Sequence, residues 1–426
     1  MHIDPWTSDS IKDYSELKKE FGIEELPEIS EEIPNSHLMF KREIVFGHRD
    51  FDKVIDAIKK GDEFSAMSGF VPSGEPHLGH KMVMDQLIWL QALGGTVFVS
   101  VADMEAFAAR NIPRDKAKKI GRDYLLSLIA LGLKEKGSYF YNQSEEKDLE
   151  DLAFELSNNI NMAELNSIYG FEGNVSLAQM YSTAIQSADI LYPQTEKFGG
   201  PKPVVVPAGT DQDPHMRLVR DVSNRVRLFK VEKNDSKMII RSKEANKDQL
   251  IEFKDILSNS GDCSVFEEHI EIEEYRDEEE IRKKTREFEL DQGGYGFIQP
   301  SSTYHRFMSG LTGGKMSSSV EESYISLLDD PEEAEEKVMN AKTGGRSTLS
   351  KQKEEGGQPE KCSVYELFFY HLLEDEDEVE EIYDNCVQGE RLCGTCKQEA
   401  ADYLKSFLEE HKSKREEAKE ELDKYM

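Results

Sequence analysis

Short apolar runs alternate with amphipathic helical patterns in the first half of the chain. The runs predict strands over residues 64–70, 96–102, 138–141 and 203–208. Between the first two, apolar residues recur at helical spacing from Leu78 and stop before Gly94-Gly95, and a second helix is predicted from Pro113 to about Leu133. Strands separated by helices indicate βαβ units, so we expect an α/β fold with a parallel sheet.

The regions outside this alternation have a different pattern of apolar, charged and proline residues. Residues 1–60 mix short helical patterns with proline breaks and one strand-like stretch at 43–46, which predicts an N-terminal extension. The α/β domain is expected to cover residues 61–323, with an acidic insertion at 231–290 whose charges we expect mostly on a solvated helical surface. Residues 324–426 show a helical pattern to the end and predict a separate helical domain.

Length and charge narrow the function classes. The 426 residues suffice for two to three domains. There are 53 basic and 85 acidic residues, so the net charge is −32, which excludes a uniformly basic nucleic-acid binder but not a local basic face. No apolar run reaches the roughly 18 residues of a membrane span, no apolar signal segment opens the chain, and five cysteines form no disulfide framework. We therefore expect a cytoplasmic protein with no membrane role.

The segment from Pro72 to His80 lies between the first predicted strand and the helix that follows it. A strand that leads through a Gly- and Pro-containing loop into a helix presents free backbone N–H groups, which bind phosphate well. His77 and His80 fall within one helical turn, so both imidazoles could donate to phosphate oxygens, and Gly79 lets a flat ring system approach the backbone. On this motif alone, a metal-binding or capping pair of histidines is an equal alternative.

A second phosphate-binding candidate is the segment Gly313-Gly314-Lys315-Met316-Ser317-Ser318-Ser319. It nearly matches the P-loop pattern G-x-x-x-x-G-K-[ST], but Ser occupies position 309 and Met follows the Lys. A lysine beside hydroxyls on a glycine-flexible loop can still reach phosphates as a mobile arm. A flexible surface linker is the alternative.

The third segment, residues 207–217, lies at the carboxyl end of the predicted strand 203–208. Ligands of open α/β sheets bind at that end. Asp211 and Gln212 can accept hydrogen bonds from an ammonium group or a ribose hydroxyl. Asp213 precedes a proline at a helix start, and for this residue we expect helix capping.

Two of these motifs together resemble a known family. His77-Leu78-Gly79-His80, followed in order by Lys315-Met316-Ser317-Ser318-Ser319, is similar to the HIGH and KMSKS signatures of class I aminoacyl-tRNA synthetases. Within that class, residues 208–221 resemble the tryptophanyl enzymes of archaeal and eukaryotic type. Asp4-Pro5-Trp6 and residues 40–50 resemble the N-terminal extension and hairpin of the same type, which the tyrosyl enzymes would not be expected to carry.

The resemblance implies a reaction and an architecture. Tryptophan and ATP, with Mg²⁺ shared by the phosphates, would give tryptophanyl-adenylate and pyrophosphate, and the aminoacyl group would pass to tRNA(Trp). It also implies a homodimer, in which each chain has a Rossmann-like nucleotide-binding catalytic domain and a C-terminal all-helical anticodon-binding domain. The alternatives are a tyrosine–tRNA ligase of the same subclass and a non-catalytic synthetase-like RNA-binding protein; the intact His77, His80 and Lys315 argue against the second.

The resemblance also assigns roles to individual residues, none of them as a metal ligand. The catalytic group would bind the ATP phosphates through the transition state and close on the leaving pyrophosphate; it comprises His77, His80, Lys315, Ser317 and Ser318. Further ATP contacts are expected from Ser73, Gly79 and Met316. The residues that would grip the α-amino group of the amino acid are Glu105, Gln186 and Gln212. An exposed carboxylate for Glu105 and a helix-surface amide for Gln186 are the alternatives.

Indole recognition stays unassigned. Where eukaryotic members place Tyr and Gln to read the indole N–H, this chain has Met67 and Ser100. Candidates lie in residues 166–174, which include Tyr169 and Glu172, and spacing does not choose between them.

Four cysteines near the C-terminus form a possible metal-ligand set. Cys362, Cys386, Cys393 and Cys396 could supply four thiolates to a zinc ion. Their spacing is irregular for a zinc ribbon, however, and buried free thiols within helices are the commoner outcome in a reduced cytoplasm. We therefore predict no metal site.

The net charge of −32 requires that tRNA meet local basic patches. Much of the acidity lies in the insertion and the C-terminal helices. We predict that the patches contain residues of the helical domain, among them Arg391, Lys397, Lys412, Lys414 and Arg415.

Overall fold

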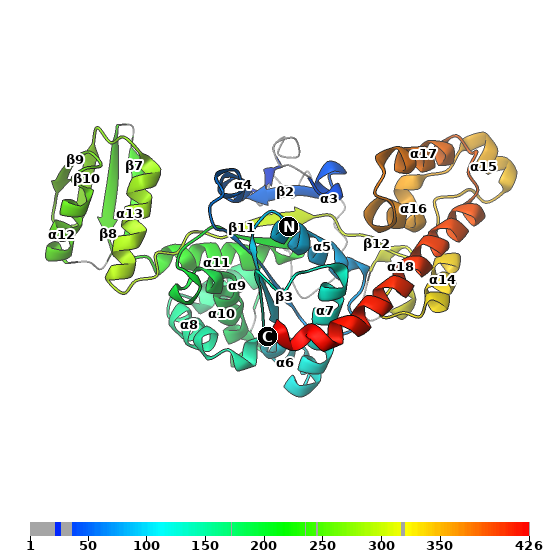
Figure 1. The fold of residues 1–426 in the computed structure, drawn as a ribbon, viewed down its shortest axis with the longest axis horizontal. Coiled ribbons are helices and arrows are strands. Elements are labelled where there is room, and N and C mark those ends of the chain that lie inside the picture. The colour runs from blue at the N-terminus through cyan, green and yellow to red at the C-terminus, as the bar shows by residue number, and fades with distance from the viewer. Residues whose placement is uncertain are drawn as a thin grey trace.

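The predicted strands form part of a seven-stranded sheet at the centre of the molecule (Figure 1). The structure, a computed structural model, describes residues 22–26, 36–171, 173–234, 236–243, 246–316 and 320–425. In spatial order the strands are β1 (Glu24–Glu25), β2 (Val45–Arg49), β11 (Ser301–His305), β6 (Val204–Gly209), β3 (Ser65–Phe70), β4 (Thr96–Val101) and β5 (Ser138–Asn142). The four predicted strands are confirmed as β3, β4, β5 and β6.

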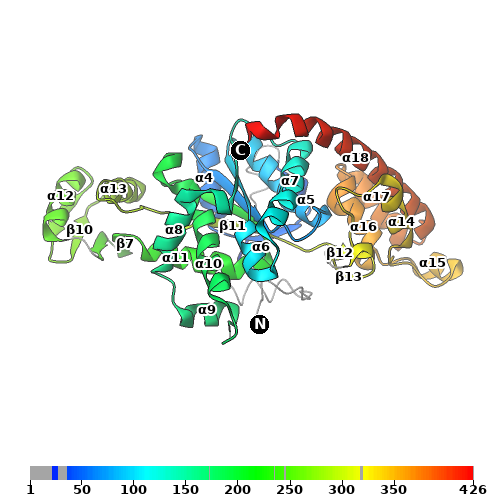
Figure 2. The same ribbon diagram turned by 90° about the horizontal axis from the view of Figure 1, so that it is seen from below.

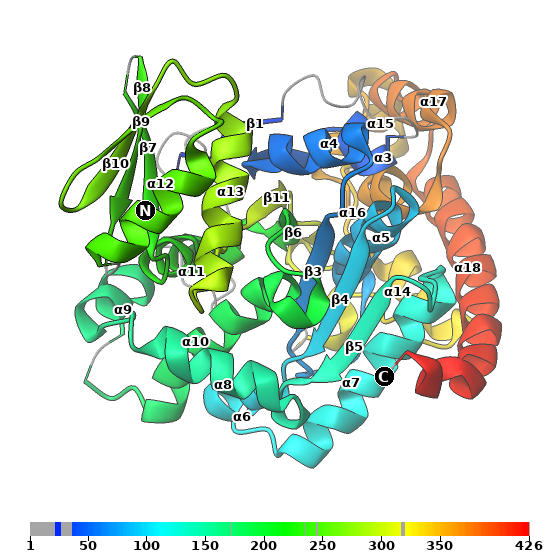
Figure 3. The ribbon, with the colours of Figure 1, turned by 60° about the vertical axis from the view of Figure 1, so that its left-hand side comes forward.

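Five neighbouring strands, from β11 to β5, are parallel (Figure 3). β2 pairs antiparallel with β11, and β1 pairs antiparallel with β2. Because the chain goes from β3 outward to β4 and β5 and then returns to β6 on the other side, the strand order reverses between β3 and β6. This is the order of a Rossmann-like sheet, as expected, and its ligands bind at the carboxyl ends of the strands at that reversal.

Helices cover both faces of the sheet, and each face has its own apolar core. In β4, Val97, Val99 and Val101 pack toward α5 and α7, whereas Phe98 packs toward α8, α10 and α11. The two predicted helices are confirmed as α5 and α7. The helices of this part are α3 (Leu38–Lys41), α4 (Phe51–Lys60), α5 (Leu78–Ala92), α6 (Asp103–Arg110), α7 (Arg114–Leu131), α8 (Lys147–Ser157), α9 (Met162–Tyr169), α10 (Leu177–Leu191) and α11 (Asp213–Arg225).

The acidic insertion is a small α/β module at one end of the molecule (Figure 1). Its elements are β7 (Phe229–Asn234), β8 (Lys237–Ser242), α12 (Lys247–Leu257), β9 (Asp262–Val265), β10 (His269–Glu273) and α13 (Glu278–Asp291). The antiparallel order is β7-β8-β10-β9, and Phe253 and Phe288 stack in its own core with ring centroids 4.5 Å apart.

The expectation of a helical surface is therefore wrong for half of the insertion. In β10, Ile270 and Ile272 are fully buried while Glu271 and Glu273 alternate with them. The acidic residues belong to a period-two strand pattern, which a count of charges does not reveal.

The C-terminal part is helical and lies at the opposite end from the insertion (Figures 1 and 2). Its elements are the short hairpin β12 (Ser309–Gly310) and β13 (Gly314–Lys315), then α14 (Pro331–Asn340), α15 (Leu349–Glu355), α16 (Ser363–Leu367), a π-helical turn (Phe368–Leu372), α17 (Glu376–Val387) and α18 (Cys393–Glu421). The long helix α18 runs back to the sheet, where Arg415 pairs with Asp123 of α7 at 2.8 Å. None of the described helices is long and apolar enough to cross a membrane.

Candidate active site

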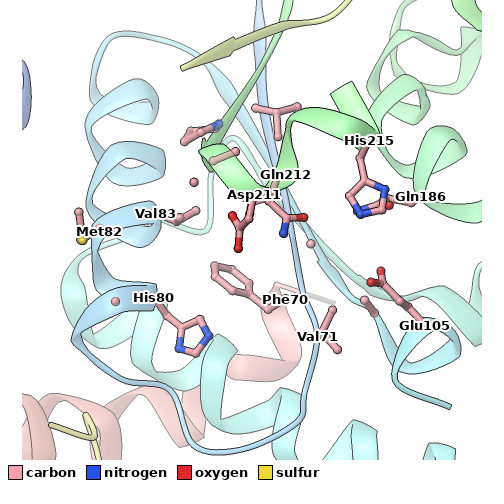
Figure 4. A pocket seen from close by; sticks show the side chains of 18 of the residues that line it. Phe70, Val71, His80, Met82, Val83, Glu105, Gln186, Asp211, Gln212 and His215 are labelled. Atoms are coloured by element: carbon pink, nitrogen blue, oxygen red, sulfur yellow. The ribbon is translucent and has the colours of Figure 1, made fainter. Parts of the chain in front are cut away.

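A cavity of about 350 Å³ opens at the carboxyl ends of β3 and β6, where the strand order reverses (Figure 4). Eight of the eleven predicted site residues line it: Ser73, His77, Gly79, His80, Glu105, Gln186, Gln212 and Met316. The backbone of Lys315 lies in β13 beside Met316, and the Lys315 side chain, like Ser317 and Ser318, lies outside the described residues. One cavity thus brings together segments that are more than 200 residues apart in the sequence.

His77 and His80 form one end of the cavity, at the N-terminus of α5. His77 is the N-cap of the helix, and its Nδ1 accepts the N–H of Gly79 at 3.1 Å. The His77 N–H in turn donates to Nδ1 of His80 at 3.2 Å, and the two ring centroids are 3.8 Å apart. The two histidines do cap the helix, as the alternative proposed. Capping uses only Nδ1 of each ring, so Nε2 of each ring is left for a ligand.

These hydrogen bonds fix the chemistry of the two rings. Because both Nδ1 atoms accept, each neutral ring carries its proton on Nε2. Burial lowers the pKa of His77 to about 4; burial and then the neighbouring His77 hold the pKa of His80 well below its ordinary value. At neutral pH the pair therefore offers two uncharged N–H donors at a helix N-terminus, which suits phosphate oxygens.

Gly79 leaves space for the His77 ring. A Cβ at position 79 would lie 2.9 Å from Cε1 of His77 and 3.5 Å from Sδ of Met316. The ring can fold back over the first helical turn only because this position carries no side chain. Met316, from the second motif, lies within van der Waals contact of the same position.

Glu105, Gln186 and His215 form the other end of the cavity, away from His80 (Figure 4). Glu105 on α6 is 8 % exposed, so the alternative of an exposed carboxylate is wrong. Burial lowers the pKa of His215 to about 3, and its Nδ1 lies 2.9 Å from the Tyr169 hydroxyl. A buried carboxylate beside neutral polar groups is suited to an ammonium ion.

Asp189 is a lining residue that the sequence reasoning missed. It follows Gln186 by one turn of α10 and is 2 % exposed. Its carboxylate accepts from Tyr141 Oη at 2.8 Å, Gln143 Nε2 at 2.6 Å and Ser100 Oγ at 3.2 Å. Burial raises the pKa of Asp189 to about 7, and these three donors oppose that rise. The available signal was that Asp189 is the one charged residue of the helix Leu177–Leu191, on the same face as Gln186.

The residues considered for indole recognition differ in their position relative to the cavity. Tyr169 does not line the cavity; its hydroxyl lies 2.9 Å from Nδ1 of His215, which does. Glu172 lies outside the described residues. Met67 does line the cavity, and Ser100 takes part through its bond to Asp189.

Arg110, at the end of α6, is a second lining residue that the sequence did not single out. Among the described residues that line the cavity, Arg110 is the one arginine. With both histidines neutral, Arg110 supplies positive charge to the cavity, and its exposed position leaves it room to move toward an anion.

Asp213 has a different role from the one expected. Gln212, not Asp213, is the N-cap of α11, and no side chain caps that helix. The buried Asp213 carboxylate instead accepts from Arg49 at 2.9 Å and from the Tyr304 hydroxyl at 2.7 Å. It joins α11 to β2 and β11, so helix capping is wrong for this residue.

The expectation of a basic patch in the helical domain is wrong for two of the five residues named for it. The Arg391 and Arg415 side chains are 17 % and 9 % exposed and pair with Glu399 and Asp123. The remaining three are also engaged: Lys397 with a main-chain carbonyl, Lys412 with Asp330 and Lys414 with Glu410. Arg415 is buried and Arg391 is half-buried, and both are already paired with carboxylates, so they are not available to phosphates.

Comparison with known proteins gives a consistent result. The model of the family described as tRNA synthetases class I (W and Y) matches residues 59–242 and 277–409. The tryptophan–tRNA ligase of Methanosarcina acetivorans is 49 % identical over 99 % of this chain and 98 % of its own, and that of Archaeoglobus fulgidus is 48 % identical over 98 % and 97 %. The crystal structure of tryptophanyl-tRNA synthetase from Aeropyrum pernix aligns with a TM-score of 0.75 at 38 % identity, over 98 % of this chain and 96 % of that one.

A nucleotide-binding sheet with its cavity at the strand reversal, and a family match over most of the chain, define a class I aminoacyl-tRNA synthetase. Within that class, the chain belongs to the tryptophanyl-tRNA synthetases of archaeal type.

Proposed function

We propose that the cavity joins tryptophan to ATP, giving tryptophanyl-adenylate and pyrophosphate, before the aminoacyl group passes to tRNA(Trp). The proposal rests on one observation: the two ends of this cavity differ in their polar groups. Uncharged N–H donors on a helix N-terminus form one end, and a buried carboxylate with two amides forms the other. These ends suit the phosphates of ATP and the α-amino group of an amino acid.

The reaction needs no covalent bond to the protein. A carboxylate oxygen of tryptophan attacks the α-phosphorus, the bond to the bridging oxygen of pyrophosphate breaks, and the electron pair leaves with pyrophosphate. Catalysis then consists of holding the reactants in line and neutralising charge as it develops. We assign the Nε2–H groups of His77 and His80 to the phosphate oxygens, with Ser73, Gly79 and Met316 beside the nucleotide.

The second motif is proposed to act on the leaving group. Lys315, with Ser317 and Ser318, would contact the departing pyrophosphate. Two observations support this: Met316 lines the cavity, and the hairpin of β12 and β13 holds the Lys315 backbone next to it. Arg110 is a further candidate for phosphate charge.

Mg²⁺ is proposed to enter with ATP. Mg²⁺ at nucleotide sites is commonly bound by substrate phosphates with only one or two carboxylates. Bound there, Mg²⁺ would offset the charge of the phosphates.

Substrate selection is proposed to rest on two groups of residues. Glu105, Gln186 and Gln212 would hold the α-amino group. Asp189 would accept the indole N–H, because its buried carboxylate belongs to the lining of the cavity and is held in place by three donors. This assigns the contact that the sequence left open.

Three further expectations belong to the proposal. The helical domain at residues 324–426 would read the anticodon, the chain would act as a homodimer, and it would work in the cytoplasm. The ion pairs of Arg391 with Glu399 and of Arg415 with Asp123 argue against a place for these two arginines on the tRNA-binding surface.

ATP–pyrophosphate exchange with each amino acid in turn tests the proposal. Exchange driven by tryptophan, with tyrosine far weaker, is the expected result, followed by charging of tRNA(Trp). Exchange driven by tyrosine would reject the assignment of substrate. Lys315→Ala is expected to lose exchange while it retains tRNA binding; full exchange in this variant would reject the role given to the second motif.

A further inference from the structure

A cavity of about 540 Å³ lies where the acidic insertion joins the catalytic domain, between the end of α11, the start of β7 and α13 (Figure 3). Among the described residues that line it, Asp221 is the one acidic residue. The basic lining residues are Arg225, Arg227, Lys230, Lys243, Arg282 and Arg286. Since the whole chain has 53 basic and 85 acidic residues, this surface reverses the charge balance of the protein.

The helix α13 gives the insertion its basic face. Arg282 and Arg286 are four residues apart, so they lie on the same side of the helix. The apolar side of α13 packs in the insertion's own core. The carboxylates that pair with these arginines belong to Glu278 and Glu279, which do not line the cavity. An insertion that is acidic by sequence thus turns cations toward the catalytic domain.

The ion pairs on this surface leave capacity for a stronger anion. Arg282 donates to Glu278 through Nε at 3.0 Å and Nη2 at 2.9 Å, which uses two of its five N–H groups. Lys230 pairs with Glu232 at 2.8 Å, yet its side chain is 62 % exposed. Exposed pairs of this kind contribute little to stability, and phosphate oxygens form strong charge-assisted hydrogen bonds. These cations can therefore turn from a carboxylate to a phosphate.

The inner part of the cavity brings like charges together. Burial lowers the pKa of the Arg286 guanidinium; Glu279 opposes this effect, and the charges of Arg227 and Arg282 lower the pKa further. Arg227 is held in place by the buried Glu289 at 2.7 Å. A bound anion would relieve the repulsion between these guanidinium groups.

The helix α11 connects this cavity to the catalytic one. Gln212 and His215, at its start, line the catalytic cavity, whereas Asn224 and Arg225, at its end, line the basic one. The helix has 13 residues, so the two cavities lie about 20 Å apart along it. A polynucleotide whose end reaches the catalytic cavity can place other phosphates at this distance. Contacts to such phosphates fix the position of a nucleic acid.

We propose that the basic cavity binds the phosphate backbone of tRNA near the end that receives the aminoacyl group. The inference rests on the proposed function, because it takes tRNA as the substrate. Phosphate contacts carry no base sequence, so the surface would hold tRNA(Trp) and other tRNAs alike, and the choice between them would be made elsewhere. The cavity would supply a local basic surface of the kind that a net charge of −32 requires.

The affinity of the full chain for tRNA(Trp), measured by filter binding at several salt concentrations, tests the proposal. A variant with Lys230→Gln, Lys243→Gln and Arg282→Gln loses three charges that line the cavity. Its Kd should rise by about ten- to a hundredfold at low salt, and the slope of log Kd against log salt concentration should fall by about two to three. A non-cognate tRNA should lose affinity by a similar factor, because the lost contacts are to phosphates.

The matched control removes three charges from the same insertion at residues that do not line the cavity. It carries Lys233→Gln, Lys237→Gln and Lys283→Gln, and each of these lysines also pairs with a glutamate. The control should keep both the Kd and the salt slope. An unchanged Kd in the first variant, or an equal loss in both, overturns the proposal. Tryptophan-dependent ATP–pyrophosphate exchange precedes the tRNA step and should be unchanged in both variants; its absence from the unchanged chain would instead reject the proposed function.

A second measurement uses the unchanged chain and does not depend on a variant that folds. Lysine acetylation followed by mass spectrometry should show that tRNA slows the modification of Lys230 and Lys243 but not that of Lys233 and Lys283. Inorganic pyrophosphate at the same phosphate concentration distinguishes a site for free phosphate groups from one for a polynucleotide. Protection by tRNA supports the proposal; protection by pyrophosphate alone, or by neither, overturns it.

Discussion

The two ends of the catalytic cavity are built in opposite ways. The histidine part of the phosphate end comes from one nine-residue segment, in which His77, Gly79 and His80 determine one another's positions through local contacts, and the second motif reaches it through Met316. The amino-acid end gathers Glu105 from α6, Asp189 from α10 and Ser100 from β4. A site made of one segment can be recognised in a sequence, whereas a site made of several appears only when the sheet has formed.

The two ends also differ in electrostatics. The histidines remain neutral at working pH, because burial holds their pKa values low. Asp189 is held near its titration point, because burial raises its pKa to about 7. Changes at the phosphate end should therefore alter rate, and changes at the amino-acid end should alter substrate affinity and its dependence on pH.

The largest effect is expected from His80→Ala. Removal of one N–H donor from the developing phosphate charge should lower tryptophan-dependent ATP–pyrophosphate exchange by about 10²–10³-fold. Tryptophan affinity, measured by fluorescence quenching, should change little. His411→Ala, at a histidine of α18 outside the cavity, is the control and should leave exchange unchanged. Equal losses in rate and tryptophan affinity would remove the distinction between the two ends.

Asp189→Asn comes next, with kcat/KM for tryptophan expected to fall by about 10–100-fold. The amide keeps the shape but replaces an acceptor oxygen with a donor. Benzothienylalanine, which has sulfur in place of the indole N–H, shows whether that contact is the cause. The preference for tryptophan over this analogue should shrink in Asp189→Asn. Asp103→Asn is the comparison variant, because Asp103 is also buried and accepts from Ser144 outside the cavity, although its charge helps to raise the pKa of Asp189. It should keep the preference for tryptophan, and an unchanged preference in Asp189→Asn would refute the contact.

Four of the five parallel strands, all but β11, and the helices α5 and α7 follow from the hydrophobic pattern alone. The strand runs and the 3.6-residue spacing from Leu78 are local features, so the sequence carries them directly. The insertion was misjudged because Ile270 and Ile272 alternate with glutamates over only five residues, and charge hid the strand period.

Tertiary contacts explain what the sequence could not supply at the sites. Asp189 depends on donors from β4, β5 and the turn after β5, and the half-buried Arg391 contacts Phe368 and Glu399. In each case a partner far along the chain decides the role of the residue.

The affinity for tryptophan should depend on pH through Asp189. The carboxylate form accepts the indole N–H, so affinity should be constant well above pH 7 and fall by up to about tenfold per unit as pH decreases below the pKa of about 7. The pKa values of about 4 for His77 and about 3 for His215 keep both rings neutral from pH 6 to 8. Fluorescence titration of tryptophan over this range measures the effect; the same slope in Asp189→Asn would assign it to another group.

The smallest effect is expected from Ser100→Ala, which tests whether Asp189 is the group that titrates in the pH profile. The Ser100 hydroxyl donates to Asp189 at 3.2 Å, the longest of its three hydrogen bonds, and this bond favours the charged form. Its loss should raise the pKa of Asp189 further, so the midpoint of the pH profile should move upward and tryptophan affinity at pH 7 should fall about two- to fivefold. Ser187→Ala is the matched control on α10, because its buried hydroxyl bonds only to the Thr183 carbonyl, and it should leave the midpoint in place. A midpoint that stays fixed in Ser100→Ala, or moves equally in both variants, would mean that the group titrating in the profile is not the carboxylate that the Ser100 hydroxyl holds.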